Sequence, residues 1–118
     1  MEMADENVQK RQHYRIVYPN PARPLLVNGK DIYNVIDLSE GGVCFEVPKK
    51  AKFEKKVGDE FRGSITFHDK ITVIIQAKVL RSNGDRVVLV LAPPLPLTRI
   101  MLEQRYLIRQ FGYKPQLS

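Results

Sequence analysis

Between Leu25 and Leu91 the apolar residues either alternate with polar residues or form short runs that turn-forming residues separate. This spacing is typical of β-strands rather than of helices. Asn28-Gly29 and the segment 82–85 carry residues suited to tight hairpin turns, and Asn-Gly in particular tolerates the positive φ angles of a type I′ turn. The predicted strands cover residues 25–27, 32–36, 43–47, 61–67, 71–80 and 87–91.

After the proline-rich segment 93–96 the apolar residues follow a helical period. The pattern predicts an amphipathic helix over 97–111, with Thr98 as a capping residue and Gly112 just past the end. The predicted fold is therefore mainly β: a six- or seven-stranded antiparallel β-barrel over residues 25–92, followed by one C-terminal α-helix.

The chain before the barrel divides into two parts. Residues 1–9 are polar and acidic without periodicity, which predicts a flexible tail. Residues 10–24 form a basic arm and a loop, in which three prolines disfavour helix and favour an extended path. One domain is thus expected over residues 10–112, with a short C-terminal tail at 113–118.

Composition narrows the class of protein. The chain has 118 residues, which fits one domain, and its single cysteine, Cys44, has no partner for an internal disulfide. No apolar stretch is long enough for a membrane span, and no signal-peptide pattern opens the chain. We expect a cytoplasmic protein without membrane insertion.

Catalysis is not expected, because no residues combine into a nucleophile with its base. Cys44 alternates with Val43 and Phe45 in a predicted strand, and His13 and His68 lie far apart in the sequence. Phosphate loops of the Walker type, glycine-rich dinucleotide turns and metal-ligand clusters are missing from the sequence. The sequence therefore predicts neither an enzyme nor a metal site nor a bound cofactor.

The net charge of +6 favours an anionic partner such as a nucleic acid, a nucleotide or an acidic protein surface. The five lysines at 49, 50, 52, 55 and 56 are interpreted as a solvated loop. More informative is Arg11-x-x-x-Arg15, preceded by Lys10, because each guanidinium is a planar fork that matches a phosphate or the O6/N7 edge of guanine. Taken alone, this pair is better explained as a solvated basic segment at the edge of the tail, since such pairs often arise by chance.

A second motif, Asp37-x-Ser39-x-x-Gly42, interrupts the strand pattern. Asp37 can accept hydrogen bonds from a base edge, Ser39 can donate to an anionic oxygen, and Gly42 can take a backbone angle closed to other residues and let a ligand approach. Asp, Ser and Gly also build ordinary turns, so this motif alone is open to a purely structural interpretation.

Taken together, the two motifs and the barrel between and after them resemble the PilZ domain family. Arg11, Arg15, Asp37, Ser39 and Gly42 match its signature position by position, and the resemblance extends over roughly residues 10–111. It implies a PilZ-like barrel that is a receptor for cyclic di-GMP, with the arginines clasping guanine and phosphate and the second motif lining the opposite side.

The resemblance adds Lys10 as a further candidate ligand residue and implies that the N-terminal arginine arm changes conformation when cyclic di-GMP binds. Arg81, at the end of a long predicted strand, is a weaker candidate. Whether one nucleotide or a stacked pair binds stays open. The signal would pass to an unidentified downstream protein, and no nucleic-acid partner is expected. Two alternatives remain at this point: a basic barrel that binds nucleic acid, and a PilZ-like adaptor that binds protein without nucleotide.

Overall fold

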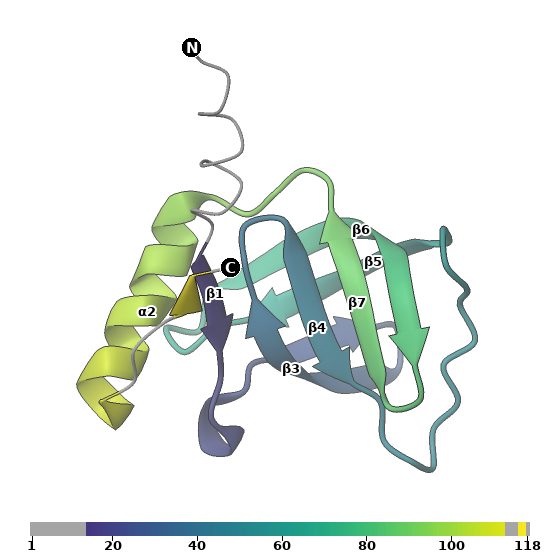
Figure 1. Ribbon diagram of the computed structural model, residues 1–118, viewed down its shortest axis with the longest axis horizontal. Helices are drawn as coiled ribbons and strands as arrows, with labels where there is room; N and C mark the ends of the chain where they lie inside the picture. Colours follow the sequence, from purple (N-terminus) through teal and green to yellow (C-terminus); the bar gives the residue numbers. More distant parts are fainter. Residues whose placement is uncertain (1–13, 113–115, 118) are drawn as a thin grey trace.

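The computed structural model describes residues 14–112 and 116–117, and Figure 1 shows a β-barrel with one helix at its side. The N-terminal half comprises β1 (Tyr14–Val17), the short 3₁₀ helix η1 (Asn20–Ala22), β2 (Leu25–Asn28), β3 (Asp31–Leu38) and β4 (Gly42–Glu46). It is followed by β5 (Glu60–Thr66), β6 (Thr72–Asn83), β7 (Arg86–Leu91), the helix α2 (Leu97–Phe111) and β8 (Gln116–Leu117).

Six strands close into an antiparallel barrel. Their order is β2-β5-β6-β7-β4-β3, and pairing between β2 and β3 joins the two ends. Alternate side chains from every barrel strand point inward, and Phe45, Phe61 and Tyr33 stack at ring-centroid distances of 4.6–5.7 Å in the core. The predicted barrel with a C-terminal helix is confirmed.

Strand β1 lies outside this closed ring, where it pairs with β3 on one side and with β8 on the other. The sequence pattern did not predict a strand before Leu25. Ile16 and Tyr18 alternate inward and are 0% and 2% exposed, so this segment is held by burial as well as by the ladder. The following proline-rich loop contains η1, whose first turn accommodates Pro21, although the prolines were expected to keep the segment extended.

The first hairpin turn lies one residue later than predicted, and the second lies within the predicted segment 82–85. Asn28 pairs with Asp31, so the turn consists of Gly29 and Lys30, and only Gly29 has a positive φ, of 62°. A type I′ turn needs positive φ at both residues, so that prediction was wrong. In the second hairpin Asn83 pairs with Arg86, and the turn is Gly84-Asp85.

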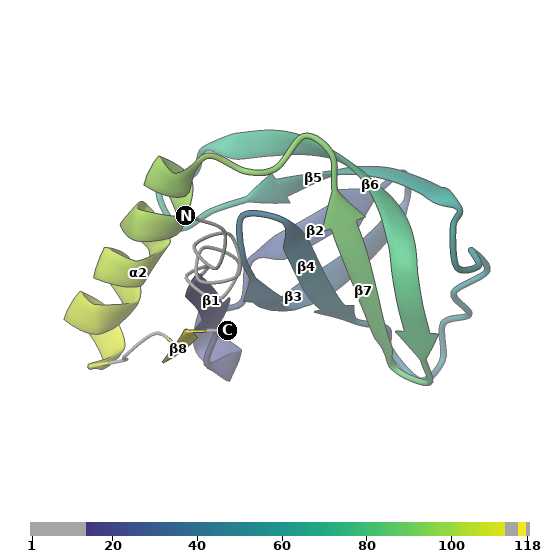
Figure 2. The ribbon, with the colours of Figure 1, turned by 45° about the horizontal axis from the view of Figure 1, so that its top comes forward.

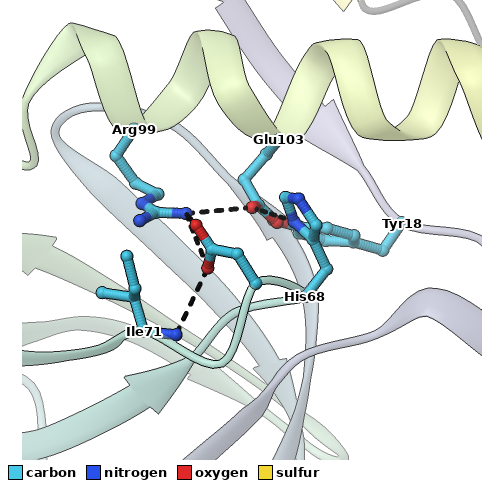
Figure 3. A network of polar contacts seen from close by, with 6 residues as sticks. Tyr18, His68, Ile71, Arg99 and Glu103 are labelled. Atoms are coloured by element: carbon cyan, nitrogen blue, oxygen red, sulfur yellow. Dashed lines mark hydrogen bonds and ion pairs between the residues drawn. The ribbon is translucent and has the colours of Figure 1, made fainter.

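Helix α2 is fixed to the barrel by a buried polar cluster, which we call the Glu103 network (Figure 3). Glu103 is 1% exposed; one carboxylate oxygen accepts from the Tyr18 hydroxyl at 2.8 Å and the other contacts His68 Nδ1 at 2.7 Å. Arg99 donates to Glu103 at 3.4 Å and to Asp69 at 3.1 Å, and its guanidinium lies 4.6 Å from the Phe67 ring centroid. The network therefore joins α2 to β1 and to the β5–β6 hairpin.

The ends of α2 agree with the prediction at one end only. Gly112 takes the left-handed conformation, with φ of 62°, and its N–H bonds to the Ile108 carbonyl at 3.0 Å. At the other end the capping position is Pro96, without a side-chain cap, so Thr98 lies inside the first turn. Within the described ranges, no helix combines the length and the apolar character that a bilayer span requires.

Candidate functional site

A row of directly paired residues crosses the outer face of the barrel, as the register of four ladders shows. Val17 of β1 pairs with Asp37 of β3, which pairs with Cys44 of β4. Cys44 pairs with Val88 of β7, and Val88 pairs with Arg81 of β6. Directly paired residues project their side chains to the same face, so Asp37 and Arg81 share one surface although they lie far apart in the sequence.

Two β-bulges put these side chains on the outer face. In β3 the register shifts between Val35 and Asp37, and Val35 and Leu38 both point inward at 0% exposure. If the alternation ran through Ile36 without a bulge, Asp37 would lie two residues after Val35 and share its inward direction. In β6 a second shift between Val79 and Arg81 turns Arg81 outward in the same manner.

These residues line a groove of about 440 Å³, which we call the arginine groove. Arg15 lies two residues before Val17 on β1 and so projects from the same face. Arg86 enters from β7 and Asn83 from the end of β6. The lining residues are Arg15, Asp37, Ser39, Gly42, Val43, Cys44, Arg81, Asn83, Arg86 and Val88.

The loop Ser39–Gly42 closes one end of the groove. The Ser39 N–H donates to the Gly42 carbonyl at 2.9 Å, which makes a tight turn. The carbonyls of Gly41 and Glu40 accept from the N–H groups of Leu91, at 2.9 Å, and Leu95, at 2.7 Å. The loop is thereby tied to the segment that leads from the barrel into α2.

Gly42 does not have the unusual backbone angle that the sequence suggested, because its φ is not among the positive values of the described glycines. Close packing is the reason for glycine here. A Cβ at this position would lie 3.3 Å from the Leu89 carbonyl oxygen and 3.6 Å from Ser39 Oγ. A side chain would therefore press on the β4–β7 ladder and would take up the space beside the serine hydroxyl.

The charges in the groove are unbalanced. Burial raises the pKa of the Asp37 carboxyl above its ordinary value, while the nearby guanidiniums of Arg15 and Arg86 lower it without cancelling the effect. Among the described residues, no side-chain hydrogen bond or ion pair holds Arg15, Arg81 or Arg86. Three guanidiniums thus face one groove with their donors available to an anion.

Cys44 lies on the floor of the groove and is 8% exposed. Burial and the charge of Asp37 raise the pKa of its thiol, and this outweighs the lowering by Arg86, Arg15 and Arg81. A raised pKa keeps the sulfur protonated at neutral pH, whereas a nucleophile needs the thiolate. In the described part of the chain, no group of three His, Cys, Asp or Glu side chains is placed to hold a metal ion.

The structure brings together Arg15, Asp37, Ser39, Gly42 and Arg81, five of the seven residues that the sequence singled out. Lys10 and Arg11 lie outside the described residues. Sequence reasoning missed Arg86 and Asn83, which belong to neither motif. Asn83 lies within the predicted hairpin turn at 82–85 and Arg86 directly after it, close to Arg81, and this position was the signal that could have found them.

Comparisons with known proteins agree with this geometry. The family model described as PilZ domain matches residues 9–109. The solved structure of the Bacillus subtilis inhibitor of motility (MotI/DgrA) superposes with a TM-score of 0.56 at 19% sequence identity. The alignment covers 86% of this chain and 52% of that one, so the chain spans about half the length of that protein. Among the curated proteins, none matches this sequence.

Proposed function

The chain belongs to the PilZ domain family, whose members are binding and regulatory modules and generally cyclic di-GMP receptors, and we propose that it binds cyclic di-GMP in the arginine groove and passes the signal to a protein partner. The observation that carries the proposal is the groove itself. On a single face it gathers one carboxylate, one hydroxyl and three arginines that pair with no side chain in the described part of the protein. These are the groups that recognise a ligand with two phosphates and two guanines.

Each groove residue has a role that suits its chemistry. Arg15 and Arg81 supply planar forks for the O6/N7 edge of guanine or for phosphate, and Arg86 adds a third. Asp37 accepts from a guanine N–H, and Ser39 donates to a phosphate oxygen. Gly42 leaves room beside Ser39 because it has no side chain. Arg11 and Lys10 precede Arg15 in the sequence and would add two more cations if they reach the same groove.

The contacts of β1 and of the loop at 39–42 suggest two places where the proposed conformational signal would arise. Arg15 lies in β1, which the β3 ladder and the buried Ile16 hold in place, so this arginine is preorganised in the absence of ligand. A change of the arginine arm would then involve residues that precede β1. A second route is the Ser39–Gly42 loop, whose carbonyls bond to Leu91 and Leu95 just before α2.

The position of the aromatic side chains disfavours a nucleic acid as the partner. Single-stranded nucleic acids are bound by aromatics exposed on a sheet face. Here Tyr33, Phe45 and Phe61 are buried in the barrel, and no described aromatic lines the arginine groove. We propose in addition that the protein acts as a cytoplasmic effector and requires no cofactor. The neighbour's description as an inhibitor of motility makes motility one process in which it could act.

Isothermal titration calorimetry with cyclic di-GMP tests the proposal. We expect saturable binding by the native chain, and a loss of about 1.5–3 kcal/mol, or roughly tenfold to a hundredfold in affinity, for Arg15→Ala. Arg62→Ala is the matched control, because Arg62 is an exposed arginine of β5 outside the arginine groove. Absence of heat from the native chain would contradict nucleotide binding and favour the adaptor alternative.

A parallel titration with Arg11→Ala asks whether the first arginine of the motif takes part. A loss of affinity similar to that of Arg15→Ala would assign it to the site. Unchanged affinity would remove it from the ligand set. The number of nucleotides bound per chain follows from the same titration and decides between one nucleotide and a stacked pair.

A further inference from the structure

Helix α2 carries two sets of apolar residues on different sides. Ile100 and Leu107 are fully buried against the barrel, on the side that also holds Glu103. Leu97, Met101, Leu102, Ile108 and Phe111 are exposed, by 40–47% of their surface, and all but Leu102 lie along one line of the helix. Phe111 has an edge contact with Tyr106, at 6.2 Å between ring centroids. A helix that buries one stripe normally presents polar residues elsewhere, so this exposed apolar surface is more than the fold requires.

The exposed stripe has the spacing of a helix–helix contact. Leu97, Met101, Gln104, Ile108 and Phe111 follow one another at intervals of four, three, four and three residues. This is the a/d spacing of a heptad repeat, in which the apolar residues of one helix meet those of another. The polar Gln104 occupies the central position, where a buried polar residue typically fixes register. We call these five residues the α2 seam.

The charges beside the seam determine what kind of helix fits it. The exposed charged residues of α2 are Arg105 and Arg109, and both are basic. Arg105 takes the e position beside the seam, and Arg109 takes a b position farther from it. Its only acidic residue, Glu103, is 1% exposed and committed to the Glu103 network. A second copy of α2 would add further arginines to this side without an exposed acid, whereas a helix flanked by Asp or Glu would pair with them.

We propose that the α2 seam is the docking site for an amphipathic helix of a partner protein whose apolar stripe is flanked by acidic residues. The surface is distinct from the arginine groove: α2 lies on the far side of β1, next to the barrel (Figure 2). The proposal adds an output surface to the proposed function but does not rest on nucleotide binding. Docking to the seam is expected with and without cyclic di-GMP.

A designed peptide tests the seam on the full chain. The probe is a helix of about three heptads with Leu at a and d and Glu at e and g, and the comparison peptide has Lys at e and g. Fluorescence anisotropy should show binding of the Glu peptide and at least about tenfold weaker binding of the Lys peptide. Like charges at every e and g position keep each peptide from pairing with itself.

Substitutions then locate the contact. The double variant Met101→Arg, Ile108→Arg should weaken binding of the Glu peptide at least about tenfold. Ile74→Arg is the matched control, because Ile74 is 64% exposed on the barrel and is not part of the seam. Circular dichroism of both variants checks that α2 and the barrel remain folded, so that a lost contact is separated from a lost helix.

Four outcomes would overturn the proposal. The first two are equal binding of both peptides and no binding of the Glu peptide. The third is a dimer of the native chain in sedimentation experiments that the double variant abolishes, which would make a second copy the occupant. The fourth is binding to phosphatidylglycerol vesicles that the same variant abolishes, which would make the seam a lipid-binding face. Failure of cyclic di-GMP to bind leaves all of these readouts intact.

Discussion

The Glu103 network and the arginine groove are built from the same kinds of residue and behave as opposites. In the network, Arg99 is 8% exposed and bonded to two carboxylates, and Glu103 also receives Tyr18 and His68. In the groove, three arginines share one face with the carboxylate of Asp37, and none of them has a side-chain hydrogen bond or ion pair with a described residue.

The difference lies in what satisfies the donors. A guanidinium that already bonds to buried carboxylates has few free donors for a ligand. Its removal leaves those carboxylates buried without a partner. A guanidinium held next to a groove without a partner gains most when an anion arrives. The network should therefore determine stability, and the groove should determine binding.

The largest expected effect comes from breaking the network. Glu103→Ala leaves Arg99 and the Tyr18 hydroxyl without their buried acceptor, and we expect a loss of about 3–5 kcal/mol in the free energy of unfolding. Urea denaturation measures it. Glu103→Gln keeps the size but loses the charge, so its free energy of unfolding should lie between those of the native chain and Glu103→Ala. A loss below about 1 kcal/mol would contradict the structural role assigned to this carboxylate.

A smaller effect, on binding alone, is expected at the groove residues outside the N-terminal motif. Arg81→Ala and Arg86→Ala should each weaken cyclic di-GMP binding by about 1.5 kcal/mol or more, since each removes a charge-assisted donor. Their unfolding midpoints in urea should stay close to that of the native chain, because neither arginine has an internal partner among the described residues. If these two variants lost stability but kept their affinity, the arginine groove would contribute to stability rather than to binding, contrary to the contrast drawn with the Glu103 network.

Gly42→Ala should affect both properties moderately. The new methyl group would lie 3.3 Å from the Leu89 carbonyl oxygen, which belongs to the β4–β7 ladder and can move only slightly. We expect a cost of about 1 kcal/mol in stability together with weaker nucleotide binding, because the methyl would take up the space beside Ser39 in the groove. Gly41→Ala is the matched control, since its Cβ would meet nothing within 4 Å.

The smallest expected effect on stability, that of Asp37→Asn, is a gain rather than a loss. Burial raises the folded-state pKa of Asp37 above the ordinary 3.8, so the folded protein binds this proton more tightly than the unfolded chain. The stability of the fold therefore falls as the pH rises from 3.8 through the folded-state pKa of Asp37. Above that pKa, the destabilisation by the buried charge is fully present. Asp37→Asn should make the protein slightly more stable at pH 7 and should weaken guanine binding.

Urea denaturation of Asp37→Asn and the native chain over a range of pH checks this sign. The stability difference should shrink as the pH falls toward 3.8 and Asp37 becomes protonated. Affinity of the native chain for cyclic di-GMP should fall over the same range, because a protonated carboxyl loses acceptor capacity. A destabilised Asn variant at pH 7 would mean that attraction to the arginines outweighs burial.

Sequence reasoning found the barrel because strand alternation depends on neighbours along the chain. Ile65, Ile75 and Leu89 could be recognised as inward-facing from their own segments, and all three are buried. The motif residues Asp37 and Ser39 were found through the family pattern. The side of the barrel on which they lie depends on the bulge beyond Val35, and no local residue preference marks that position.

The features that were missed depend on contacts between distant segments. The Glu103 network joins β1, the β5–β6 hairpin and α2, and Tyr18 and Glu103 are separated by 85 residues. Arg99 and Glu103 were detectable as an i, i+4 pair beside Ile100, but nothing in the sequence located His68 next to them. Arg86 was likewise placed in the groove by ladder pairing rather than by a motif.

The two bulges mean that the groove depends on residue count as well as residue identity. Ile36 and Leu80 bring no polar group to the ligand, yet each shifts the alternation that decides which neighbours face outward. A regular pairing in which Ile36 opposed Cys44 would turn the carboxylate of Asp37 toward the barrel interior while leaving every motif letter intact. A chain can therefore retain the complete signature and lose the receptor through a change of strand register alone.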